Sequence, residues 1–115
     1  MRYTVDYFIK KFEAIPYDQW TTGLYVRGKR KCALGHCGVN FGFSLIHENK
    51  EASALREILI AAVPAINDGT RLTANATHRD FRKLGDNPKD RILTALLYAK
   101  AGIWKEMINT LAPLP

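Results

Sequence analysis

Apolar side chains recur along most of this chain at the three- and four-residue spacing of an α-helix. In the first segment with this spacing they are Val5, Phe8, Ile9, Phe12 and Ile15. Thr4 can cap the segment, and Pro16 ends it. Because an amphipathic helix must bury its apolar stripe against neighbouring elements, this spacing predicts a core built from helices.

The clearest helix start in the sequence is an Asn-Pro-Lys-Asp motif. Asn87 is a preferred capping residue, Pro88 suits the first helical position, and Asp90 completes an acidic form of the capping box. The helix that follows has apolar residues around most of its circumference until Gly102, so we expect it to be the central and most buried one. A last helix is expected over residues 103–111.

Two further helices are predicted from their capping residues. Asn49 can cap a helix over residues 50–63, where a proline then breaks the pattern. The Asn-Asp-Gly sequence at residues 67–69 predicts a turn, because these residue types tolerate positive φ. Thr77 can cap a short basic helix over residues 78–84.

Shorter features are expected between these helices. Residues 17–22 predict a short helical turn that includes Trp20. Residues 24–34 predict a small β-hairpin with Gly28 in its turn, and a plain loop is the alternative. The apolar segment that follows contains three glycines: Gly35, Gly38 and Gly42. Since glycine costs a helix up to about 1 kcal/mol relative to alanine, three of them indicate the close approach of another backbone.

The length of 115 residues fits one globular domain over residues 1–115 that needs neither a disulfide nor a metal to fold. The expected fold is therefore mainly α, a compact single-domain bundle of about five helices with one small β-hairpin near residues 24–34. The chain lacks an apolar run long enough for a membrane span, and its first residues lack the apolar stretch of a signal peptide. We expect a cytoplasmic protein.

The net charge of +6 makes nucleic acid or an acidic protein surface a plausible partner. The densest basic patch comprises Arg27, Lys29, Arg30 and Lys31. A second comprises Arg79, Arg82, Lys83, Lys89 and Arg91. Tyr17 and Tyr25 lie near the first patch in sequence, so it could grip a phosphate backbone and stack a base. The alternative is a solvated hairpin tip and a solvated helix face.

Cys32, His36 and Cys37 are candidate metal ligands, with His47 or His78 as the fourth. Structural zinc sites, however, usually show two separate clusters of paired ligands, and a second cluster is missing from this sequence. We therefore favour two buried thiols and a hydrogen-bonded imidazole over a zinc-stabilised domain. No cofactor is expected, because neither a Gly-x-Gly-x-x-Gly nor a P-loop pattern is present.

The second functional hypothesis, from a different class, is a cysteine-dependent hydrolase or transferase. Cys32 or Cys37 would be the nucleophile, the base would be His36, His47 or His78, and Asn67 or Asp68 would orient that histidine. The nearby basic run would lower the pKa of a thiol. These residue types occur in most proteins of this size, and only their geometry would define a site.

Several short motifs together resemble a family of small bacterial and phage proteins classed only as a domain of unknown function. They are Trp20 with Gly23, Cys32-Ala33-Leu34-Gly35, Ile66-Asn67-Asp68, and Arg91-Ile92-Leu93-x-Ala95-Leu96. The chain departs from the family at His36-Cys37-Gly38, which puts any shared ligand in doubt. The resemblance supplies no activity, but if its motifs act together, Trp20, Cys32 and Asp68 should pack near one another as a structural knot or a pocket wall.

The leading functional hypothesis is a non-enzymatic binding or accessory module for a protein or nucleic-acid partner. It rests on the positive net charge and on the lack of a complete catalytic constellation.

Overall fold

A computed structural model describes residues 2–23, 25–39, 48–69 and 79–111 of the chain. In chain order the elements are α1 (Val5–Glu13), the 3₁₀ turn η1 (Tyr17–Gln19), β1 (Val26–Arg27), β2 (Arg30–Lys31), α2 (Ala33–His36), α4 (Lys50–Ile58), α5 (Val63–Asp68), the 3₁₀ turn η2 (Phe81–Leu84), α6 (Pro88–Lys100) and α7 (Trp104–Thr110). The predicted mainly α fold with one small hairpin is confirmed. None of the helices within the described ranges is both long and apolar enough to span a bilayer.

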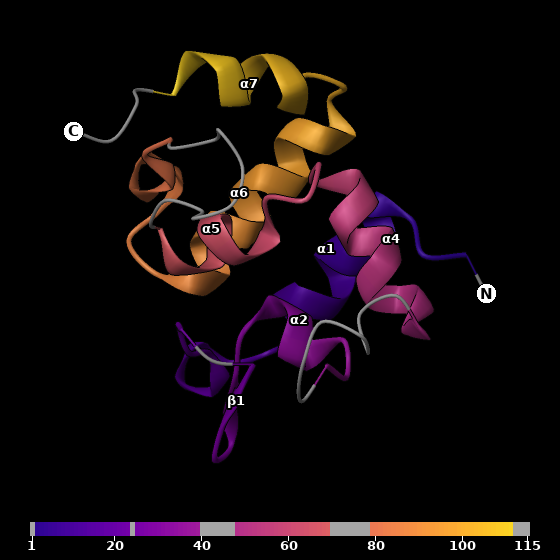
Figure 1. Ribbon diagram of the computed structural model, residues 1–115, viewed down its shortest axis with the longest axis vertical. Helices are drawn as coiled ribbons and strands as arrows, with labels where there is room; N and C mark the ends of the chain where they lie inside the picture. The colour runs from indigo at the N-terminus through magenta and orange to yellow at the C-terminus, as the bar shows by residue number, and fades with distance from the viewer. Residues whose placement is uncertain (1, 24, 40–47, 70–78, 112–115) are drawn as a thin grey trace.

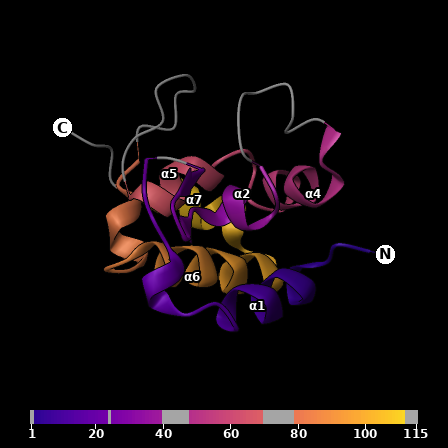
Figure 2. The same cartoon turned by 90° about the horizontal axis from the view of Figure 1, so that it is seen from below.

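Helix α6 lies at the centre of the fold, as its sequence predicts. Figure 2 shows α6 beside α1 in one layer, with α2, α4 and α5 in a second layer. Asn87 caps α6 by accepting a hydrogen bond from the Asp90 backbone N at 2.9 Å, and Pro88 is at its start. Ile92 and Leu96 are fully buried. The apolar circumference is not entirely covered, because Leu97 is 56% exposed.

Helix α1 follows its predicted pattern. The Thr4 hydroxyl accepts a hydrogen bond from the Tyr7 backbone N at 3.1 Å, which caps the helix. Phe8 and Phe12 are fully buried and stacked, with ring centroids 5.9 Å apart. These rings bring the apolar stripe of α1 into the core that α6 also enters, so local pattern and packing agree.

The predicted helix over residues 50–63 is wrong in its last five residues, 59–63. Asn49 caps α4 as expected, but the helix ends at Ile58. Ile60 and Ala61 adopt positive φ, and the Ala61 backbone N donates to the carbonyl of Arg56, five residues back. This wider turn ends α4 and redirects the chain before the next helix begins.

Residues 59–62 form the connection, and Val63, the last residue of that predicted segment, begins α5 instead. Pro64 lies in the first turn of α5, where its missing N–H costs nothing. Asn67 and Asp68 form the last turn of this helix, and only Gly69 has the positive φ, at 70°. The sequence therefore placed the turn about two residues early.

The predicted helix over residues 78–84 is a 3₁₀ turn that begins later. Asp80 caps η2 by accepting from the Arg82 backbone N at 3.1 Å. The proposed cap Thr77 lies outside the described residues, as does His78.

The small hairpin is present and stands out at the lower edge of Figure 1. Its strands pair Val26 with Lys31 and Arg27 with Arg30. Gly28 has φ of +62°, as the first residue of a two-residue hairpin turn requires. With two residues in each strand, the hairpin depends on packing against the helices.

Gly35 shows the close backbone approach that the glycines predict. A Cβ added there would lie 1.8 Å from the carbonyl oxygen of Tyr25 and 3.1 Å from the Cβ of Lys31. The same Tyr25 oxygen accepts a hydrogen bond from the Cys32 backbone N at 3.2 Å. The hairpin is therefore seated directly on α2. A Cβ added at Gly38 would lie 3.3 Å from Nδ2 of Asn49, and Gly42 lies outside the described residues.

Candidate functional site

Three exposed cations surround an open hollow beside the hairpin, and we call them the hairpin patch: Arg27, Lys29 and Arg30. The hollow has a volume of about 540 Å³, and within the described ranges Asp18 and Gln19 also line it. Three of the four residues in the basic patch expected from the sequence therefore line the hollow.

The fourth residue is Lys31, which does not line the hollow. Successive side chains of a strand point to opposite faces, so Arg27 and Arg30 share one face and Val26 and Lys31 share the other. Lys31 is half-buried, and its backbone bridges to Trp20. The strand alternation separates it from the hairpin patch.

Asp18 and Gln19 reach the hollow from η1, and the sequence did not predict them. The Thr21 backbone N donates to the Lys31 carbonyl at 3.1 Å, which holds the end of the η1 segment against β2. No local pattern connects these two segments, because their contact is made between residues ten positions apart. The sequence predicted a helical turn over residues 17–22, but it did not predict the contact of that turn with β2.

The second basic patch is largely committed to internal contacts. Arg79 donates to the Leu111 carbonyl at 3.2 Å, and Arg82 pairs with Asp80 at 2.8 Å. Lys83 is exposed on η2. These three cations therefore do not form a single free surface comparable with the hairpin patch.

Lys89 and Arg91 were wrongly assigned to that surface, since both are buried. The Lys89 ammonium donates to the Glu13 carbonyl at 3.0 Å and lies 4.4 Å from the centroid of the Tyr17 ring. The physical reason is their place in the first turn of α6, a helix that other elements surround.

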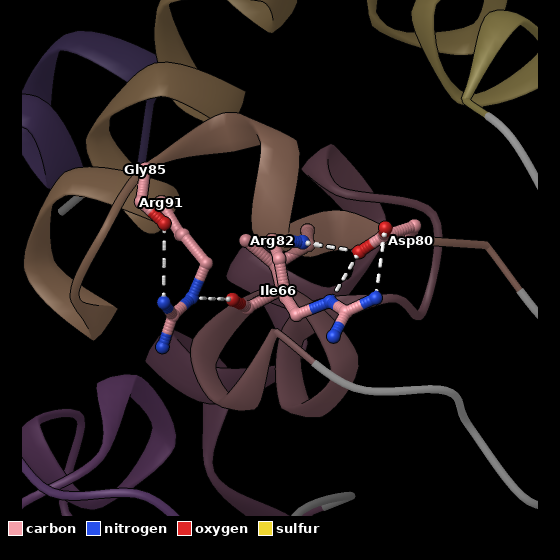
Figure 3. Close-up of polar contacts among 5 residues, drawn as sticks. All are labelled: Ile66, Asp80, Arg82, Gly85 and Arg91. Atoms are coloured by element: carbon pink, nitrogen blue, oxygen red, sulfur yellow. Dashed lines mark hydrogen bonds and ion pairs between the residues drawn. The ribbon is translucent and has the colours of Figure 1, made fainter. Parts of the chain in front are cut away.

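The guanidinium of Arg91 donates to three backbone carbonyls, of which Figure 3 shows those of Ile66 and Gly85. It donates to Ile66 at 3.0 Å, to Asn67 at 2.7 Å and to Gly85 at 3.2 Å. Burial lowers the pKa of Arg91, opposed by nearby carboxylates that include Asp68. Arg91 thus binds the C-terminal turn of α5 to the start of α6.

Asn67 and Asp68 form a second internal network rather than an open ligand site. Asn67 accepts from the Ala33 backbone N at 3.1 Å and donates to the Thr21 carbonyl at 2.9 Å. Asp68 accepts from the Gly23 backbone N at 3.0 Å. These bonds join the motif segments that contain Gly23, Ala33 and Asn67-Asp68. Direct packing of Trp20, Cys32 and Asp68 on one another stays a prediction.

Cys32 and Cys37 are buried free thiols at the two ends of α2. The Cys32 sulfur accepts a hydrogen bond from the Gly35 backbone N at 3.5 Å. Burial raises the pKa of Cys32, and burial together with Glu51 raises the pKa of Cys37 to about 12. Both thiols are therefore protonated at neutral pH, and the geometry gives the nucleophile hypothesis no support.

His36 packs against an aromatic ring instead of a thiol. Its ring centroid lies 4.8 Å from that of Trp20, and its Nε2 donates to the Gln19 carbonyl at 2.9 Å. Burial lowers the pKa of His36, so the ring is neutral at physiological pH. This is the hydrogen-bonded imidazole that the sequence favoured.

We expect neither thiol of the folded protein to react with iodoacetamide at or below about pH 7.5, because only the thiolate is nucleophilic. Mass spectrometry of Cys32→Ala and Cys37→Ala would assign each label to one thiol. In guanidinium chloride both cysteines should be labelled rapidly, which is the control for reagent activity. Labelling of either native thiol at the rate of the unfolded chain would restore the cysteine-enzyme hypothesis.

Across the ranges that the structure describes, no three His, Cys, Asp or Glu side chains lie close enough to share a metal ion. The proposed fourth ligands, His47 and His78, lie outside those ranges.

Comparison with protein-family models, with curated proteins and with solved structures gives no match. The resemblance to the bacterial and phage family stays a prediction.

Proposed function

We propose that this protein is a non-enzymatic module that binds the phosphate backbone of a nucleic acid through the hairpin patch. The observation that carries this proposal is the pairing of Arg27 directly opposite Arg30 across the hairpin. Like charges in that position destabilise a two-stranded ribbon. A phosphate between the two guanidinium groups would remove the repulsion, so an anion is the ligand best matched to this surface.

The composition of the hollow supports the same conclusion. Its lining contains three cations and one carboxylate, Asp18, so its net charge is positive. Arginine forks bind the oxygens of phosphates and of carboxylates in pairs, and a cluster of three cations matches the closely spaced charges of a phosphate backbone. Exposure of all three cations leaves them accessible to a long polyanion.

Charge reversal of the hairpin patch should weaken this binding strongly and reduce its salt dependence. The variant is Arg27→Glu, Lys29→Glu and Arg30→Glu, which takes the net charge from +6 to 0 because each reversal subtracts two. The slope of log K against log salt concentration should fall by about two to three, since each phosphate contact contributes about 0.7 to 0.9. Fluorescence polarisation with labelled oligonucleotides between about 50 and 200 mM salt would measure it.

The matched control reverses three exposed lysines on other elements: Lys50, Lys83 and Lys105. It produces the same net charge of 0, so it distinguishes the effect of the hairpin patch from the effect of the protein's net charge. The control should bind much more tightly than the hairpin variant. Equal weakening in both variants, or unchanged binding by the hairpin variant, would contradict the proposal.

A further inference from the structure

We propose that the nucleic acid is single-stranded and that Tyr17 stacks on one of its bases while the adjacent hairpin patch binds its phosphates. This inference rests on the proposed function and adds the class of nucleic acid. The two surfaces adjoin: Asp18 and Gln19, which directly follow Tyr17, line the same hollow as Arg27 and Arg30.

The ring of Tyr17 is exposed and yet held in place. It is 58% exposed, which is unusual for an aromatic side chain of this size. Its hydroxyl donates to Asp90 at 2.8 Å, and the Lys89 ammonium lies 4.4 Å from the ring centroid. Lys89 is itself fixed by the Glu13 carbonyl. The ring is therefore anchored at its edge and on one face, and the exposure falls on its remaining surface.

A fixed and exposed ring is suited to stacking. Ordering a side chain on binding costs conformational entropy, and a ring that is already anchored avoids most of this cost. Every nucleobase presents a flat π surface, so such a platform accepts bases without regard to sequence. Tyr25, the other tyrosine considered for this role, is half-buried against the core.

Backbone contacts place the turn that carries Tyr17 next to the hairpin. The Trp20 backbone N donates to the Tyr17 carbonyl at 3.3 Å, and Trp20 forms a bridge with Lys31 of β2. Figure 1 shows the chain after α1 running alongside the hairpin. A single-stranded nucleic acid lying across this surface would contact the ring and the cations together.

The distribution of charge orients the strand. The ring side of the surface carries the Asp90 carboxylate, which holds the Tyr17 hydroxyl, and the Lys89 ammonium, so its two charges offset each other. The hairpin side carries the guanidinium groups of Arg27 and Arg30. Phosphates are thus favoured over the hairpin and bases over the ring. In a duplex the base faces are covered by their neighbours, which leaves no base for Tyr17 to stack on and favours a single strand.

Three labelled probes of equal length, about 15 nucleotides, would test this: oligothymidine, its duplex with oligoadenosine, and an abasic oligomer with the same phosphates. Oligouridine would add the RNA arm. Wild type should bind the two base-bearing single strands more tightly than the duplex or the abasic oligomer. Tyr17→Leu should weaken single-strand binding by about 5- to 100-fold and leave abasic binding unchanged.

Tyr17→Trp is the conservative variant and should retain single-strand binding. Its exposed indole should be quenched by oligothymidine, whereas the native Trp20 and Trp104 are buried. Equal single-strand binding by wild type and Tyr17→Leu, or equal wild-type affinity for oligothymidine and the abasic oligomer, would overturn the stacking role and leave the hairpin proposal intact. Failure of wild type to bind any of the probes would overturn both. Thermal melting followed by circular dichroism would check that each variant is folded.

Discussion

Arg91→Met is expected to lower the free energy of unfolding by about 3–5 kcal/mol, as measured by urea denaturation followed by circular dichroism. The wild-type guanidinium donates to the carbonyls of Ile66, Asn67 and Gly85, and the first two of these contacts are buried. A hydrogen bond to a charged group contributes about 1.5–3 kcal/mol, and methionine would leave the buried acceptors without a donor.

Two further variants sharpen the Arg91 experiment. Arg91→Lys keeps the charge but not the planar fork, so it should recover only a minor part of the loss. Arg82→Met removes an exposed arginine of η2 that pairs with Asp80, and its unfolding midpoint should stay close to that of wild type. If Arg91→Met unfolds at the same urea concentration as Arg82→Met, the three-carbonyl contact does not stabilise the fold.

Gly35→Ala is expected to cost about 3 kcal/mol of folding free energy, at the upper end for one added methyl group. The new Cβ would lie 1.8 Å from the Tyr25 oxygen and 2.9 Å from its carbonyl carbon. These are backbone atoms, which cannot rotate away as a side chain can. Either the hairpin must lift from α2 or the short helix must move.

Gly28→Ala is the matched control for that substitution. Its φ of +62° is strained for alanine, but nothing lies within 4 Å of the added Cβ, so only the strain of about 1–2 kcal/mol applies. Hydrogen exchange adds a local measurement, because the Cys32 backbone N donates to the same Tyr25 oxygen. This amide should exchange faster in Gly35→Ala alone. Unchanged protection and an unchanged midpoint would contradict the predicted clash.

The helix starts were predictable because their causes are local. The caps Thr4, Asn49 and Asn87 each bond to a backbone N–H three residues ahead, and that spacing is visible in the sequence. The break after Ile58 was not predictable in the same way. It needs Ile60 in a backbone conformation that β-branched residues rarely adopt, and surrounding packing must impose it.

The candidate site was only partly predictable. Arg27, Lys29 and Arg30 could be identified as a basic cluster because they are neighbours in sequence. Tyr17 could be identified as a neighbour of this cluster for the same reason. The contribution of Asp18 and Gln19 to the hollow, and the contacts that anchor the Tyr17 ring and leave it exposed, could not be predicted, since they depend on how η1 packs against β2 and α6.

By itself, the sequence determined the helical character of this protein, most helix starts and the position of the hairpin turn, because periodicity, capping and turn preferences act over a few residues. Only the tertiary structure decided which polar groups face solvent. Arg91 and Asn67 resemble surface residues in the sequence, yet each bonds to backbone groups 24 or more residues away, with the contact from Arg91 to Gly85 as the one short-range exception. The sequence alone does not distinguish a buried arginine from an exposed one. The fold brings distant backbone carbonyls to the buried arginine, and these carbonyls accept its hydrogen bonds.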